Sequence, residues 1–156
     1  MSRELSAAGL LGAVSLAAIL FSSPAQAATC NATVNSTDAM QFTTKTLVVP
    51  ASCKQFTVTL KHVGKLPKTA MGHNFVLGKT SDIDGINADG MKAGVRQNYV
   101  EPGDPRVIAA SKVVGGGESA TVTIPVAKLK AGEKYTYICS FPGHASMMRG
   151  TLSLAK

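Results

Sequence analysis

The sequence predicts an all-β fold, a Greek-key sandwich or barrel with a short helical excursion on its outside. Three observations favour this class: short segments with period-two alternation, turn residues between them, and no regular alternation of strands with helices. In the segment 56–62, Phe56, Val58 and Leu60 alternate with polar residues, which is typical of a half-buried strand. We therefore expect short, mainly antiparallel strands packed in two layers around one core.

The expected strands follow one another at short intervals along the chain. They cover residues 47–49, 56–62, 107–109, 119–126, 135–139 and 151–154. Proline, glycine and aspartate residues separate them at 49–50, 64, 101–105, 115–117 and 131–132. The polar segment 81–98 lacks period-two alternation, and Ser81 can cap a helix with Asp82 and Asp84 in its first turn. This segment is not a calcium loop, because Ile86 and Ala93 occupy two of the ligand positions.

The first 27 residues have the pattern of a cleaved secretory signal peptide. Arg3 precedes an uncharged apolar run over 10–21, and Ala25-Gln26-Ala27 matches the small-x-small cleavage site. A transmembrane helix needs about 20 apolar residues, so this run is too short to favour a span. We expect residues 28–156 to form a single domain in the periplasm, without stable membrane association.

The composition narrows the classes of partner. Sixteen Lys and Arg residues against nine Asp and Glu residues give a formal net charge of +7, which favours acidic partners. The lysines are scattered and are not interleaved with aromatic residues, so we exclude nucleic acid as a partner.

Three cysteines in an oxidising compartment leave one without a disulfide partner. Cys30 and Cys53 lie outside the C-terminal group of metal-binding residue types and could close a loop. Such a bridge stabilises the fold by roughly 3 kcal/mol on the chain-entropy model. Cys139 would then be unpaired, and a free thiol in the periplasm tends to oxidise unless it is buried or bound to a metal.

Metal-binding residue types concentrate in the segment 139–148. Cys139, His144 and Met148 lie within ten residues, and His73 comes from a distant loop. A thiolate, imidazole nitrogens and a weak axial sulfur suit copper. Singly, a buried cysteine is often a small hydrophobic residue and a loop methionine a gap-filler. Their combination predicts a copper site.

Other uses of these residues are less well supported. A nucleophilic Cys139 with a histidine base lacks an orienting third group and an oxyanion loop. A copper reductase or oxidase needs further metal sites and more than three histidines. A zinc site prefers a closed set of Cys and His and has no use for a thioether. A copper-storage or chaperone module remains an open alternative.

Two segments resemble the copper-binding segments of the azurins, a family of small bacterial blue-copper proteins of the cupredoxin type. They are Met71-Gly72-His73-Asn74-Phe75 and the segment 139–148, whose Cys-x4-His-x3-Met spacing separates azurins from plastocyanins and pseudoazurins. The resemblance extends over the whole mature chain. It implies one copper ion and a disulfide between Cys30 and Cys53. It implies three strong ligands, a weak axial thioether and an axial backbone carbonyl: His73, Cys139, His144, Met148 and Gly72.

The resemblance also implies roles around the ligands. Backbone N–H groups of Asn74 and Phe141 would donate to the Cys139 sulfur, and Asn74 would connect the two loops. His62 continues the series of Phe56, Val58 and Leu60 on one face of its strand, so we expect it to be partly buried near the site. In azurins its protonation couples weakly to the copper potential, which predicts a pH-dependent midpoint. Phe75 stands where some azurins have a tryptophan, a difference in core packing.

The implied function is one-electron transfer, without substrate turnover. Electrons would pass through an apolar surface around the edge of His144, formed by Met40, Leu66, Ala70, Met71, Phe141, Pro142, Gly143, His144 and Met147. We call this set the predicted transfer surface. Its implied partners are periplasmic redox proteins, such as c-type cytochromes or copper-containing reductases, that dock transiently.

Overall fold

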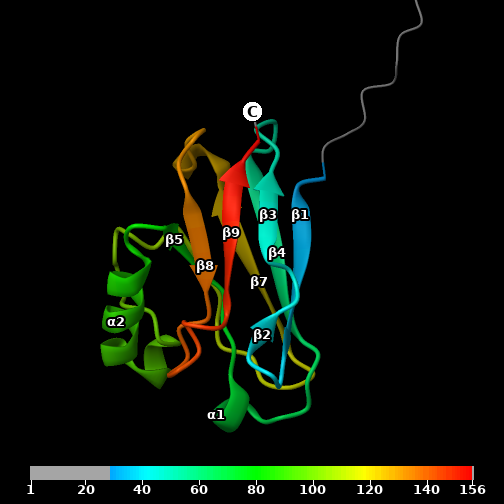
Figure 1. The fold of residues 1–156 in the computed structure, drawn as a ribbon, viewed down its shortest axis with the longest axis vertical. Helices are drawn as coiled ribbons and strands as arrows, with labels where there is room; N and C mark the ends of the chain where they lie inside the picture. The colour runs from blue at the N-terminus through cyan, green and yellow to red at the C-terminus, as the bar shows by residue number, and fades with distance from the viewer. Residues whose placement is uncertain (1–28, 156) are drawn as a thin grey trace, which may run out of the picture.

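The computed structural model describes residues 29–155, so the predicted signal peptide (1–27) lies outside the described residues. Two β-sheets pack face to face, and the strands run along the longest axis of the molecule (Figure 1). The four-stranded sheet has the order β2-β1-β4-β7 and contains β1 (Asn31–Thr37), β2 (Gln41–Phe42), β4 (Gln55–His62) and β7 (Ser119–Pro125).

The second sheet has five strands in the order β3-β9-β8-β5-β6. Its members are β3 (Thr46–Val49), β5 (Val76–Lys79), β6 (Ala109–Ala110), β8 (Tyr135–Ile138) and β9 (Arg149–Leu154). The all-β sandwich is therefore confirmed. The expectation of antiparallel pairing is wrong for two pairs, because β1 pairs with β4 and β3 with β9 in parallel. The chain crosses to the other sheet between β1 and β4, which allows this parallel pairing.

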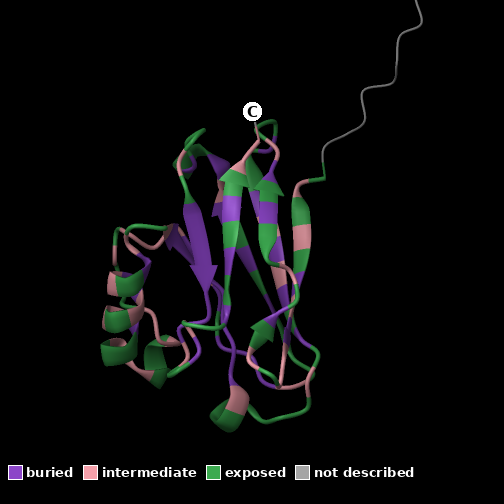
Figure 2. Ribbon diagram, in the orientation of Figure 1, coloured by how far each residue is buried: buried purple, intermediate pink, exposed green. Residues whose placement is uncertain are grey.

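The predicted helical excursion lies outside the five-stranded sheet. It contains α2 (Ile83–Ala93) and the 3-10 turn η1 (Val95–Gln97), and α2 starts after Asp82 instead of Ser81. Ile83 and Ile86 pack with Val76 of β5 and Ile138 of β8. All four residues of β8 are buried, because the core covers one face and α2 the other (Figure 2). Two further short helices are α1 (Lys68–Met71) and η2 (Val126–Lys128).

The core follows the alternation seen in the sequence. Inward-facing residues of β4 lie opposite those of β7, with Phe56 against Ile124 and Val58 against Val122. The strands β1, β2 and β5 were not predicted: β1 is rich in Asn and Thr, β2 has two residues, and β5 is buried on both faces and so shows no alternation. The predicted strand 107–109 is reduced to β6, which begins at Ala109.

The predicted disulfide is confirmed. Cys30 and Cys53 are bonded, with 5.8 Å between their Cα atoms. The bridge joins the residue before β1 to the loop before β4, at the start of the two parallel strands. Among the described residues, no helix has the length and apolarity to cross a membrane.

Candidate metal centre

The predicted ligands meet at one end of the sandwich, at the lower end in Figure 1. Cys139 directly follows β8, and the segment 139–148 connects β8 to β9 at this end. His73 lies between α1 and β5 and reaches the same end from the neighbouring strand. Antiparallel pairing of β5 with β8 places the start of β5 beside the end of β8. This pairing brings together residues 66 positions apart in the chain.

Three side chains converge here with all their ligand atoms close together. One atom from each of His73, Cys139 and His144 lies within 4.8 Å of the other two. The Cys139 Sγ atom is 3.8 Å from His73 Nδ1 and 3.6 Å from His144 Nδ1. The exposed fractions of the three residues are 0%, 0% and 4% for His73, Cys139 and His144. Spacings of this size leave room for one ion between the atoms.

His73 is held by contacts with distant parts of the chain. Its backbone forms an isolated bridge with Val114, with N···O distances of 2.9 and 2.8 Å. Its Nε2 lies 3.0 Å from the Thr37 carbonyl oxygen. Because a carbonyl only accepts, Nε2 carries the proton and donates, which leaves the Nδ1 lone pair free to face Cys139.

His144 is held by its own loop. Its N–H donates to the Phe141 carbonyl, and its carbonyl accepts from the N–H groups of Met147 and Met148. The ring lies against the rings of Phe141 and His73, at centroid distances of 4.8 and 5.1 Å. Burial lowers the pKa of His144 and lowers that of His73 to about 4. Both imidazoles are therefore neutral at neutral pH, the form that binds metals.

Burial has the opposite effect on the thiol. It raises the pKa of Cys139 to about 11, while the backbone N–H groups of Asn74 and Phe141 act in the lowering direction. Cys139 is the free cysteine among residues 29–155. A buried thiol beside two neutral nitrogens becomes a good anionic ligand once a cation compensates the charge. The donor set therefore fits a soft cation such as copper.

Asn74 connects the two ligand-bearing loops. Its side-chain nitrogen donates to the Ser140 hydroxyl at 2.9 Å and to the Asn98 carbonyl at 2.7 Å, and its side-chain oxygen accepts from the Ser140 N–H at 2.8 Å. Ser140 also donates to the Tyr99 carbonyl at 2.7 Å. The roles of Ser140, Asn98 and Tyr99 were not predicted, and no local sequence signal indicates them.

Gly72 and Met148, the two further predicted ligands, both have backbone contacts with Cys139. The Gly72 carbonyl oxygen is 3.9 Å from Cys139 Sγ. A Cβ atom at Gly72 would lie 2.6 Å from the Lys68 carbonyl oxygen and 2.8 Å from the Phe141 ring, so only glycine fits. Met148 is fully buried, and its carbonyl accepts from the Cys139 N–H at 3.0 Å. Met147, the competing thioether, is 52% exposed.

His62 is fully buried, where partial burial was expected. Its ring stacks on that of His73, with a centroid distance of 4.5 Å and an interplanar angle of 11°. Its Nδ1 accepts from the Gly64 N–H at 3.1 Å, so Nε2 is the protonated nitrogen and donates to the Met71 carbonyl at 3.1 Å. The stacking on His73 and the hydrogen bonds to Gly64 and Met71 are contacts that strand alternation does not predict.

The predicted transfer surface surrounds His144 with side chains of mixed exposure. Leu66, Ala70, Pro142, Gly143 and Met147 are exposed, whereas Met40, Met71 and Phe141 are half-buried. Beside Phe141 lies a hollow of about 210 Å³, which extends the apolar area towards η1. Its lining includes Tyr99 and Val95, and Val95 is 64% exposed. Sequence reasoning missed both residues, because Val95 lies in the excursion and Tyr99 directly follows it.

Known proteins with the same pattern are close relatives over nearly the whole chain. The azurin of Achromobacter denitrificans is 57% identical over 148 residues, which cover 94% of this chain and 99% of that protein. Azurin-2 of Alcaligenes xylosoxydans xylosoxydans is 61% identical over 127 residues, covering 81% of this chain and 98% of that protein. The solved structure of the azurin Az-iso2 from Methylomonas sp. strain J matches with a TM-score of 0.80 and 50% identity, covering 83% of this chain and all of that one.

The family model described as copper-binding proteins of the plastocyanin/azurin family matches residues 28–155. This match spans the two sheets and the buried His73, Cys139 and His144 cluster. The chain belongs to the plastocyanin/azurin family of copper-binding proteins.

Proposed function

We propose that the protein carries single electrons between redox partners in the periplasm through one type 1 copper site. The copper cofactor and the class of electron carrier follow from the family and from the buried His73–Cys139–His144 cluster. The single observation that carries the proposal is the convergence of one thiol and two neutral imidazoles within 4.8 Å, with no large opening to solvent.

The ligand roles are part of the proposal. His73, Cys139 and His144 would hold the ion as strong ligands, while Met148 and the Gly72 carbonyl would be weak ligands. Copper bound there supplies the Cu(II)/Cu(I) couple, which accepts and releases single electrons. Met148 is preferred over Met147 because Met148 is buried beside Cys139, whereas Met147 points outward.

The surrounding chain suits a redox site that changes little on electron transfer. Hydrogen bonds to Thr37 and across Asn74 hold the ligands from several strands, so their positions are fixed before any ion binds. The buried site also excludes water, whose rearrangement would slow electron transfer. Supporting contacts of this kind orient metal ligands and tune their basicity.

The predicted transfer surface provides the entry for electrons. His144 is nearly buried, and the Phe141 ring packs against it, while Pro142 and Gly143 face solvent. A small apolar area of this kind suits transient docking, where fast release matters more than affinity. We infer partners of the c-type cytochrome or copper-reductase class, whose acidic groups would match the net positive charge of this chain. The periplasmic location rests on the signal-peptide pattern of residues 1–27 and on the disulfide, which needs an oxidising compartment.

His62 is proposed to influence the copper potential without binding the ion. Its stacking on His73 gives a physical route from its protonation to the copper potential. The expected result is a midpoint potential that changes between mildly acidic and mildly alkaline pH. A flat potential over this range would remove His62 from the proposal and leave the rest intact.

The test of the function is colour followed by electron exchange. Adding Cu(II) to the purified mature chain should produce an intense blue thiolate-to-copper band, and the blue form should exchange electrons rapidly with a soluble c-type cytochrome. A colourless complex would exclude type 1 copper. Colour with slow exchange would favour the alternative function, a copper-storage or chaperone module.

A further inference from the structure

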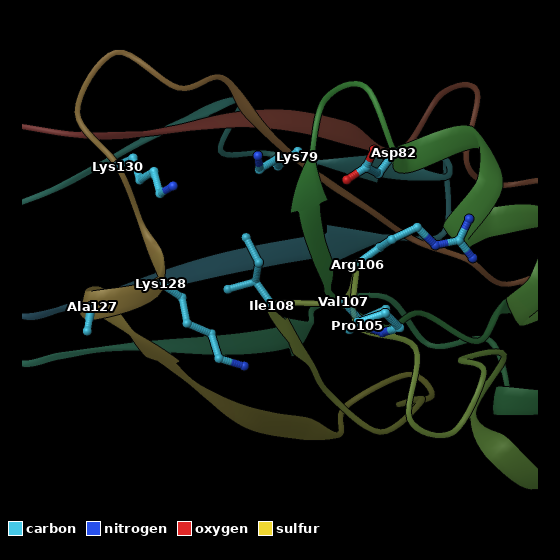
Figure 3. Close-up of a pocket in the computed structure, with 9 residues that line it drawn as sticks. All are labelled: Lys79, Asp82, Pro105, Arg106, Val107, Ile108, Ala127, Lys128 and Lys130. Carbon is cyan, nitrogen blue, oxygen red and sulfur yellow. The ribbon is translucent and has the colours of Figure 1, made fainter.

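A second candidate site lies at the other end of the sandwich, among basic side chains. It is a cavity of about 290 Å³, at the lower end of the volume range for small-molecule sites. Lys79 at the end of β5, Lys128 of η2 and Lys130 in the following loop line it, together with Arg106. Figure 3 shows Lys128 and Lys130 on one side of Ile108, and Asp82 and Arg106 on the other.

The four basic groups differ in how far their charge is already compensated. Arg106 is bound to Asp104 and Asp89, both at 2.7 Å, and Lys79 to Glu133 at 3.2 Å. Lys128 and Lys130 are exposed, and neither ammonium lies within 4.0 Å of a carboxylate in the described part of the chain. Glu133 is close enough to Lys130 for a longer-range interaction. Two positive charges therefore remain available to a ligand.

The remaining lining determines which anion fits. Pro105, Ile108 and Ala127 supply the apolar part of the lining, here called the apolar floor, with Ile108 between the Lys128–Lys130 side and the Asp82–Arg106 side (Figure 3). A phosphate monoester carries nearly two negative charges at neutral pH, which match the two available ammonium groups. Its organic part can cover the apolar floor, which inorganic phosphate cannot do. We propose that this cavity binds a phosphate monoester through Lys128 and Lys130.

One carboxylate in the lining should weaken phosphate binding, so a variant without it should bind phosphate more tightly. Asp82 lines the cavity and accepts a hydrogen bond from the Ser81 hydroxyl at 3.1 Å. Its negative charge should repel the phosphate, so its removal should strengthen binding. Its side chain makes no capping hydrogen bond to α2, so asparagine should replace it without loss of the helix.

The cavity acts independently of the metal centre. Lys79 lies six residues after His73, and the chain between them is extended and includes β5, so the rise per residue of a strand places their Cα atoms roughly 20 Å apart. This exceeds the Debye length of about 8 Å at physiological salt, so a bound phosphate should leave the copper site unaffected. Failure of the phosphate site would therefore say nothing against electron transfer, and the reverse also holds.

The experiment is an NMR titration with glycerol 3-phosphate at low salt, on both the metal-free and the Cu(I)-loaded protein. Amide shifts should concentrate around residues 105–108 and 127–130. The double variant Lys128→Gln/Lys130→Gln should weaken binding at least about tenfold, since each charged hydrogen bond contributes strongly. Asp82→Asn should strengthen it, and Lys61→Gln, an exposed lysine on β4, should leave it unchanged.

Two further probes identify the source of the phosphate. Inorganic phosphate should bind more weakly than the ester, and vesicles containing phosphatidic acid present the same group as a lipid headgroup. Binding to vesicles alone, with the same dependence on Lys128, Lys130 and Asp82, would support the phosphate site and assign it to a lipid. The proposal is overturned if no probe binds at millimolar concentration, or if Lys61→Gln weakens binding as much as the double variant.

Discussion

The two histidine ligands are held in different ways. His73 depends on distant partners: its backbone pairs with Val114 and its ring donates to the Thr37 carbonyl. His144 depends on a local turn, in which Phe141, Met147 and Met148 supply the hydrogen bonds. One ligand is therefore part of the folded sandwich, and the other is carried by a short loop attached to it. Removing the contacts of His73 should therefore cost more free energy of unfolding than removing those of His144.

The largest expected effect is loss of the thiolate. Cys139→Ser should abolish the blue band in the copper-loaded protein, since the serine oxygen is neither soft nor anionic at neutral pH. The visible absorption spectrum after copper addition measures the blue band. The matched control is Ser146→Ala, an exposed substitution in the same loop, which should keep the colour. An intense blue band in the Cys139→Ser variant would mean that the thiol is not a ligand.

The connection between the two loops should have the next largest effect. Asn74→Ala removes three hydrogen bonds, two of them buried, and leaves partners on Ser140 and Asn98 unsatisfied. We expect a loss of roughly 2–4 kcal/mol in the free energy of unfolding of the metal-free protein. Urea denaturation measures it, with the exposed Asn31→Ala as the control. A loss below about 1 kcal/mol would show that the loops hold their positions separately.

The two histidines can be compared directly in the metal-free protein. His73→Ala removes one of two hydrogen bonds to the Thr37 carbonyl, which keeps the one from the Met40 N–H, and it removes the stacking on His62. His144→Ala opens a nearly buried edge of a loop. We expect His73→Ala to be more destabilising, by about 1–3 kcal/mol. Denaturation of both variants under one condition provides the measurement. Equal losses would contradict the distinction drawn between the two ligands.

The stability of the metal-free protein should fall in mild acid because two of its histidines are buried with lowered pKa values. The pKa of His73 falls from its ordinary 6.5 to about 4 in the folded protein, and that of His144 is also lowered. A depressed pKa means that the unfolded state binds the proton first, so stability is full above about pH 6.5 and falls towards pH 4. The carboxyls with lowered pKa, Asp38, Asp89, Asp104, Glu118 and Glu133, contribute to losses only at lower pH.

The measurement is the free energy of unfolding of the metal-free protein between pH 7 and 5. His73→Gln should flatten the decrease over this range, because it removes the group with the large shift. Lys61→Gln should leave the slope unchanged. A wild-type stability that stays constant down to pH 5 would show that folding does not lower the pKa of these histidines.

The smallest expected effect concerns the axial thioether. Met148→Leu conserves volume in a fully buried position, so we expect a stability change below about 1.5 kcal/mol. The blue colour should remain while the midpoint potential shifts, because a weak axial ligand tunes the site without holding it. Voltammetry measures the shift, with Met147→Leu as the exposed control. An equal shift in both variants would remove the special role of Met148.

The sequence predicted that Cys139 and His144 lie close together, and the structure confirms this, whereas the role of Met148 stays a prediction. The spacing of Cys139, His144 and Met148 allows only a compact loop, and the odd number of cysteines pointed to Cys139 independently. Alternation in β4 and β7 predicted their inward faces, since one side of each strand must be apolar. The strands β1 and β5 escaped prediction, because β1 is polar and β5 is buried on both faces.

Only the tertiary structure decided how the distant segments meet. Strand β1 pairs with β4 and β3 with β9, in both cases in parallel and across a long stretch of chain. The hydrogen bonds from His73 to Thr37 and from Asn74 to Ser140 and Asn98 also join distant residues. The basic cavity likewise gathers Lys79, Lys128 and Lys130 from separate elements. Local spacing determines which atoms one loop can present. The distance to a second loop depends on strand register and packing, which many weak contacts determine together.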